Sequence, residues 1–180
     1  LEPVGAQTML TDGIASAYRP GRDRVASVDG VEELVSSSPE GRQATPFLFA
    51  TTGKEWMANE ALGEEVFGPL GLVVRAADLD EAQKIARSLH GQLTCTIHMD
   101  DADTGDAQKL MPVLERKAGR ILVNSFPTGV EVCDSMVHGG PYPASTNFGA
   151  TSVGTLSIRR FLRPVCYQNM PDALLPEAFG

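Results

Sequence analysis

Residues 64–75, with the sequence EEVFGPLGLVVR, decide how this chain folds. The apolar half, residues 70–74, has the composition of a short strand that is buried on both faces. The six residues before it combine two adjacent carboxylates, an aromatic ring and a Gly-Pro break. A ligand site uses such a combination, because a carboxylate accepts hydrogen bonds from hydroxyls and a ring can flank a planar group. A solvated acidic turn beside a core phenylalanine is the alternative, and on residue types alone it is the commoner outcome.

The segments after this strand alternate between helix and strand. Asp78 and Glu81 have the spacing of a capping box, which predicts a helix over 78–90 with Gly91 as its stop. A strand, a second helix and a third strand are then predicted, at 93–99, 104–118 and 120–124. Pro112 is expected to kink the second helix or delay its start. This alternation implies right-handed crossovers and an α/β fold with a doubly wound, mostly parallel sheet.

Less regular segments flank this centre. Apolar spacing predicts a first helix over residues 4–18, which Pro20-Gly21 stops. Residues 126–155 are rich in glycine and proline and indicate a long loop of the kind that carries function. Pro164 lacks an amide hydrogen, so residues 158–168 are predicted to form an edge strand.

The composition limits the partners and the location. The 180 residues carry a net charge of −8 with scattered lysines and arginines, so nucleic acid is not an expected partner. No apolar run approaches the roughly 20 residues of a membrane span, and residues 1–20 lack the features of a signal peptide. Three widely spaced cysteines favour the reducing cytoplasm. Because the chain begins at Leu1, we expect part of a longer polypeptide, with an intact protein that lost a leader as the alternative.

The side chains that could perform catalysis do not form a complete set. Cys133, Asp134 and His138 could supply a thiol nucleophile and a base, but a loop fixes no geometry between them, and an incidental cysteine is the commoner case. Cys95 has the surroundings of a small core residue. The histidines lack metal-ligand spacing, and no phosphate-binding glycine loop occurs, so no metal site is predicted.

Three stretches, taken in order, resemble the C-terminal part of the aldehyde dehydrogenases. They are EEVFGP at 64–69, GQLT at 91–94 and GRILVN at 119–124. The resemblance covers nearly the whole chain and weakens before residue 45. The stretch GGPYPASTNFG at 139–149 and the ending RRFLRPVCYQN at 159–169 are similar to the subgroup that oxidises 2-oxoglutarate semialdehyde, which is 2,5-dioxopentanoate.

The resemblance implies roles for five residues. Glu65 would hold the ribose hydroxyls of a nicotinamide cofactor, NAD or NADP, and Phe67 would contact the nicotinamide. Ser125, Phe126 and Val130 would line the aldehyde pocket. No catalytic residue is expected here, because the family's nucleophilic cysteine, general-base glutamate and nucleotide-binding half lie in segments that this chain lacks. The 180 residues alone should therefore be inactive.

The resemblance also implies an organisation and partners. Residues 1–155 would be the C-terminal part of the catalytic domain, 156–172 an oligomerisation strand and 173–180 a tail. The partners would be the remainder of the same polypeptide, an aldehyde, and further copies in a homodimer or homotetramer. Two alternatives stay open: an acyl-CoA or semialdehyde-phosphate reductase of the same architecture, and a stand-alone interaction domain whose edge strand pairs with a partner.

Overall fold

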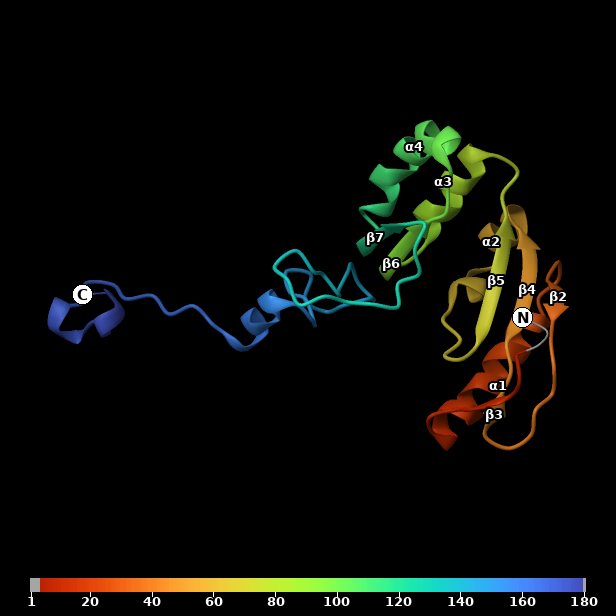
Figure 1. The fold of residues 1–180 in the computed structure, drawn as a ribbon, viewed down its shortest axis with the longest axis horizontal. Coiled ribbons are helices and arrows are strands. Elements are labelled where there is room, and N and C mark those ends of the chain that lie inside the picture. The colour runs from red at the N-terminus through yellow and green to blue at the C-terminus, as the bar shows by residue number, and fades with distance from the viewer. Residues whose placement is uncertain (1–3, 180) are drawn as a thin grey trace.

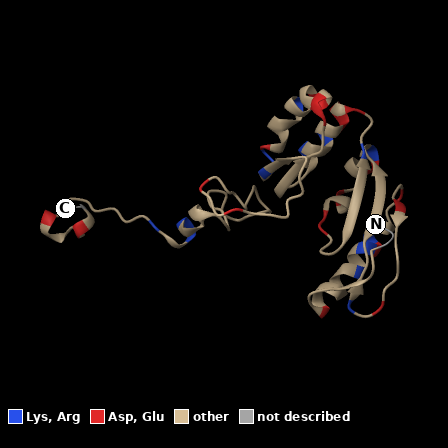
Figure 2. Ribbon diagram, viewed as in Figure 1, with Lys and Arg blue, Asp and Glu red and all other residues tan. Residues whose placement is uncertain are grey.

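The structure, a computed structural model, describes residues 4–179 as two packed units followed by an extended C-terminal segment (Figure 1). Basic and acidic residues are interspersed along both units (Figure 2). The strands are β1 Gln7–Thr8, β2 Glu32–Val35, β3 Gln43–Ala44, β4 Phe47–Thr52, β5 Leu70–Arg75, β6 Gln92–Ile97 and β7 Ala118–Val123. The α-helices are α1 Asp12–Ala26, α2 Gly53–Ala58, α3 Leu79–Ser88 and α4 Thr104–Leu114. The 3₁₀ helices are η1 Glu60–Gly63, η2 Asp101–Asp103, η3 Thr155–Phe161, η4 Asp172–Leu174 and η5 Glu177–Phe179.

Parallel pairing joins the central strands. β4 pairs in parallel with β5, and β6 pairs in parallel with β7. β2 adds an antiparallel strand to β4, while β1 and β3 form a separate short ribbon. β5 and β6, which α3 connects, are not hydrogen-bonded to each other and belong to different sheets. The α/β class with parallel strands is confirmed, but the described residues form two parallel pairs and not one continuous sheet.

The cap of α3 confirms the predicted helix start. Asp78 Oδ1 accepts the Glu81 N–H at 2.8 Å, and Glu81 Oε2 accepts the Ala77 N–H at 2.6 Å. Pro112 lies in the last turn of α4, which continues past it to Leu114. None of the helices among residues 4–179 is both long enough and apolar enough to cross a bilayer.

The first helix differs from the prediction. α1 begins at Asp12, where Thr11 Oγ1 accepts the Ile14 N–H at 3.1 Å, and it continues through Pro20. Gly21 is buried, and the Val66 side chain packs directly against it. Tertiary packing therefore carries the helix past residues that would end it in isolation.

The predicted strand at 158–168 is not formed. Residues Thr155–Phe161 are a 3₁₀ helix, and the segment after them joins no strand ladder among the described residues. This segment runs away from both packed units (Figure 1). A strand needs hydrogen-bonding neighbours on at least one edge, and no other described strand lies beside this segment.

The larger core lies between α1 and the sheet that contains β4. Phe49 is completely buried, and Phe47, Tyr18 and Val25 are nearly so. The smaller core lies between the β6–β7 pair and the two helices α3 and α4, and its buried residues are Ala86, Val113 and Leu114. Residues 64–69 connect the end of η1 to β5, so this turn borders the larger core.

Candidate functional site

The turn at residues 64–69 is attached to α1 through alternate residues. Glu64 Oε2 lies 3.0 Å from Arg24 Nη2. The Val66 side chain packs on Gly21 so closely that a Cβ there would meet Val66 Cγ1 at 3.0 Å. Both contacts point from the turn toward the same helix.

The Gly-Pro break completes this attachment. A Cβ on Gly68 would overlap the ring of Tyr18, so only glycine lets the backbone lie flat against that ring. The Pro69 carbonyl accepts the Phe47 N–H at 2.8 Å and the Tyr18 hydroxyl at 3.4 Å. The turn is thereby tied to the start of β4 as well as to α1.

Glu65 and Phe67 occupy the intervening positions and are exposed. The Phe67 side chain is 65% exposed, although phenylalanine is among the residues most often buried in proteins. Glu65 takes part in no ion pair or hydrogen bond among residues 4–179. The turn therefore presents a carboxylate and an aromatic ring while its other residues hold it in place.

Glu65 borders two clefts. One, of about 750 Å³, runs from Phe67 over the apolar side chains of Trp56 and Ile85. The other, of about 630 Å³, opens toward β6 and includes Thr94. A carboxylate that borders both clefts is suited to accept hydrogen bonds from the hydroxyls of a ligand bound in either of them.

The second predicted set lies in the loop after β7. Ser125, Phe126 and Val130 are all exposed, and Phe126 is 74% so. The Phe126 ring lies 5.5 Å from the His98 ring, so the loop begins beside the carboxyl end of β6. None of the three lines either cleft bordered by Glu65. The structure thus keeps the two predicted sets in separate places.

Asn124 fixes the point where this loop starts. Its Nδ2 donates to the Met99 carbonyl at 2.7 Å, and its Oδ1 accepts the Met99 N–H at 2.8 Å. Its backbone has a positive φ of 50°, a conformation that asparagine tolerates better than most residues. Both ends of the amide are used in joining the two strand ends, which makes Asn124 a structural residue.

Two glycines have functions that sequence reasoning missed. Gly91 is not the helix stop, since α3 ends at Ser88. A Cβ on Gly91 would overlap the Pro141 carbonyl, and one on Gly119 would overlap the Gly139 carbonyl. The long loop therefore crosses directly over the amino ends of β6 and β7. The glycines at positions 91 and 119 and in the loop were the sequence signal that could have indicated this close approach of two backbones.

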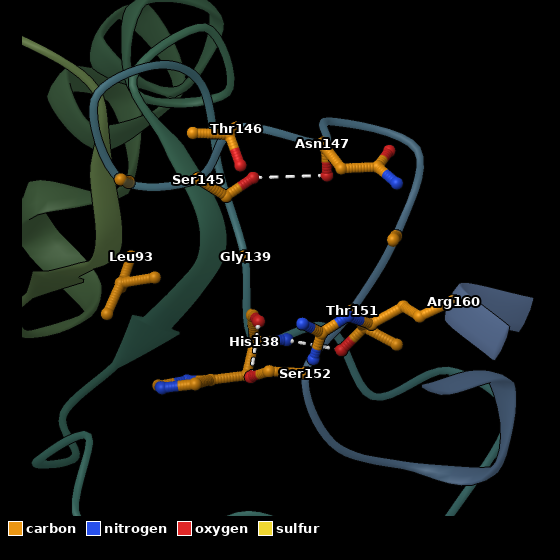
Figure 3. Close-up of a pocket in the computed structure, with 11 residues that line it drawn as sticks. Leu93, His138, Gly139, Ser145, Thr146, Asn147, Thr151, Ser152 and Arg160 are labelled. Carbon is orange, nitrogen blue, oxygen red and sulfur yellow. Dashed lines mark hydrogen bonds between the residues drawn. The ribbon is translucent and has the colours of Figure 1, made fainter. Parts of the chain in front are cut away.

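That loop lines an open pocket of about 360 Å³, to which Arg160 reaches from η3 (Figure 3). Thr151 Oγ1 accepts the His138 N–H at 2.8 Å, and Ser152 Oγ donates to the His138 carbonyl at 2.9 Å. His138 Nδ1 is buried without a hydrogen-bond partner among the described residues. The backbone of His138 is therefore firmly held, while its imidazole is not paired with a nucleophile.

Cys133, Asp134 and His138, the thiol and base candidates from the sequence, do not form a catalytic arrangement. Cys133 Sγ lies 3.4 Å from Ser135 Oγ, and Asp134 bonds to the Thr155 hydroxyl. Neither bonds to His138 in the part of the chain that the structure describes. Within the same residues, no group of three or more His, Cys, Asp and Glu side chains could hold a metal ion.

Comparison with known proteins gives close sequence relatives. No protein-family model matches the chain. It is 53% identical over 178 residues to alpha-ketoglutaric semialdehyde dehydrogenase 2 of Azospirillum brasilense, covering 98% of this chain and 34% of that protein. It is 45% identical over 174 residues to alpha-ketoglutaric semialdehyde dehydrogenase of Acinetobacter baylyi, covering 95% and 33%. The chain spans about a third of the length of these relatives.

A solved structure shares the fold. Betaine aldehyde dehydrogenase from Staphylococcus aureus, determined in complex with NAD⁺, superposes with a TM-score of 0.61 at 18% identity. The superposition covers 86% of this chain and 29% of that protein. The chain therefore shares its fold with part of a much larger protein.

Proposed function

We propose, for a chain whose sequence and fold match part of the aldehyde dehydrogenases, that the complete polypeptide oxidises a semialdehyde with NAD or NADP. The substrate we infer is 2,5-dioxopentanoate and the product 2-oxoglutarate. The observation that carries this proposal is the outward pair Glu65 and Phe67 on an anchored turn. The names of the curated relatives support the substrate class.

In this proposal Glu65 accepts hydrogen bonds from the ribose hydroxyls next to the nicotinamide. The carboxylate can take two hydroxyl donors, and it has no competing partner among the described residues. Phe67 contacts the nicotinamide and excludes water from one side of it. Held by these two residues, the nicotinamide would supply the acceptor for the hydride that leaves the substrate. The attachment of the turn to α1 fixes where both side chains stand.

The nucleophile is proposed to be a cysteine of the polypeptide outside these 180 residues. Its thiol adds to the aldehyde to form a thiohemiacetal, and loss of a hydride leaves a thioester that water hydrolyses to the acid. Cys95 is unsuited to that step, since burial raises the pKa of its thiol and keeps it protonated. Cys166 lies in the extended C-terminal segment.

Ser125, Phe126 and Val130 are proposed to line the aldehyde pocket. Their exposure leaves them available to the rest of the polypeptide. Residues 156–172 are proposed to become a strand in a homodimer or homotetramer. That segment carries Phe161, Leu162 and Val165, whose side chains are 83%, 66% and 55% exposed.

An aldehyde panel on the complete polypeptide tests the proposal. Reduction of NAD or NADP with 2,5-dioxopentanoate, faster than with neutral aldehydes of similar length, is the expected result. Product formation that requires coenzyme A or phosphate would instead identify a reductase of the same architecture. Absence of aldehyde-dependent reduction with either cofactor would refute the proposed activity.

A further inference from the structure

Arg120 stands on the face of β7 that α3 and α4 do not cover. Its neighbour Ile121 packs with Cys95 in the small core beneath the helices. Because side chains alternate along a strand, Arg120 points to the opposite face, beside its register partner Thr94. Thr94 lines the cleft that Glu65 borders, so this face of the strand pair lies beside that cleft.

The guanidinium of Arg120 holds the loop at residues 125–132. Nη1 donates to the Gly129 carbonyl at 2.6 Å, and Nη2 donates to the Pro127 carbonyl at 3.2 Å. The Met136 sulfur lies 3.8 Å from Nη1. In the described structure, no other hydrogen bond joins residues 125–132 to a residue outside them. One side chain therefore supplies the hydrogen bonds that hold this loop to the rest of the described chain, beside the ring contact between Phe126 and His98.

The chemistry of this contact needs arginine. A guanidinium presents donors in a fixed planar fork, which can reach two carbonyls that are two residues apart. A lysine ammonium can approach one of them closely but lacks the fork. Arg120 forms no ion pair with a described carboxylate, and its Nε is buried without a partner. Its charge is directed to the loop carbonyls.

We propose that Arg120 is a positioning residue that sets the place of Phe126 and Val130 in the aldehyde pocket. This inference rests on the proposed function of the loop. Arg120 itself does not touch the reacting atoms. It acts by holding the backbone between these two apolar side chains at Pro127 and Gly129.

The test compares Arg120→Met and Arg120→Lys in the complete polypeptide. Arg120→Met should raise the KM for the aldehyde about tenfold, since hydrogen bonds to a charged group contribute about 1.5–3 kcal/mol. Arg120→Lys should give an intermediate KM. In both, the KM for the cofactor should be unchanged, and kcat should fall less than twofold. Arg116→Met, an exposed arginine just before β7, is the matched control.

Amide hydrogen exchange supplies a readout that does not require turnover. Faster exchange in residues 125–132 of Arg120→Met, with β6 and β7 unchanged, is expected. Unchanged exchange and an unchanged aldehyde KM would overturn the inference. Faster exchange throughout β6 and β7 in both variants would also overturn it, because Arg120 would then support the sheet and not the loop. If wild type oxidises no aldehyde, the proposed function fails, whereas the exchange comparison still decides whether Arg120 holds the loop.

Discussion

The turn at residues 64–69 and the loop at residues 125–132 each present an exposed phenylalanine, but they are held differently. The turn contacts α1 through four of its six residues, Glu64, Val66, Gly68 and Pro69, and β4 through a backbone hydrogen bond. The loop is joined to the rest of the described chain by hydrogen bonds from Arg120 alone. The turn is supported by the larger core, whereas the loop is supported by hydrogen bonds from one side chain and by the contact of Phe126 with His98.

This difference fits the two proposed ligands. The ribose of the cofactor is the same in every turnover, so a turn held at several points can keep its side chains in one fixed binding geometry. An aldehyde pocket distinguishes relatives with different substrates, and a loop with one attachment can change without disturbing a core. The following predictions test this contrast, from the largest expected effect to the smallest.

Gly68→Ala should disrupt the turn most. The added methyl group overlaps the Tyr18 ring, and overpacking of this kind costs about 1–3 kcal/mol of unfolding free energy. Gly63→Ala is the control, since its Cβ would meet the Trp56 ring at an ordinary 3.7 Å. Denaturant unfolding of the complete polypeptide measures both. Equal stability of the two variants would show that the turn is not held by close packing.

Glu65→Gln should weaken cofactor binding while leaving the fold intact. Loss of the charge on the acceptor should raise the cofactor KM about tenfold. Glu64→Gln removes the neighbouring carboxylate, whose exposed ion pair with Arg24 is worth about 0–1 kcal/mol of stability. Steady-state kinetics with NAD and with NADP measures the cofactor KM of the Glu65→Gln and Glu64→Gln variants. Equal effects on cofactor KM would contradict the outward role of Glu65.

Phe126→Ala should change aldehyde KM without changing stability. A side chain that is 74% exposed contributes little to the core, so unfolding free energy should stay within about 0.5 kcal/mol of wild type. Phe49→Ala, at a completely buried position, should instead cost about 3–5 kcal/mol. Thermal unfolding compares the two. A large stability loss at Phe126 would mean that the loop belongs to a core.

Tyr18→Phe should have the smallest effect at neutral pH. The lost hydrogen bond to the Pro69 carbonyl is long at 3.4 Å, so we expect a cost of about 0.5 kcal/mol. Burial raises the pKa of the Tyr18 hydroxyl above its ordinary value of 10.0, although Arg22 opposes this. The stabilisation from the protonated folded form is therefore complete below pH 10 and is lost as pH rises through the folded pKa. Unfolding free energy between pH 8 and 11 should fall more steeply in wild type than in Tyr18→Phe; parallel curves would contradict this.

Local patterns in the sequence were sufficient for the middle of the fold. The capping spacing of Asp78 and Glu81 placed α3, and alternation placed β5, β6 and β7, because short-range hydrogen bonds and periodicity govern those elements. The same reasoning was wrong at Pro20, where a buried contact overrides propensity, and at residues 158–168, beside which none of the described strands lies. Arg120 was missed because its acceptors are backbone carbonyls, which residue types do not reveal.

By itself, the amino-acid sequence determined the order of strands and helices from β5 to β7 and the identity of the EEVFGP segment, since both are properties of neighbouring residues. Only the tertiary structure decided which of its two carboxylates is free. Glu64 and Glu65 are chemically identical, and the choice depends on Arg24, some 40 positions away in sequence, lying within 3.0 Å of one and not pairing with the other. Contacts between distant residues are set by packing, and packing is not encoded in any short segment.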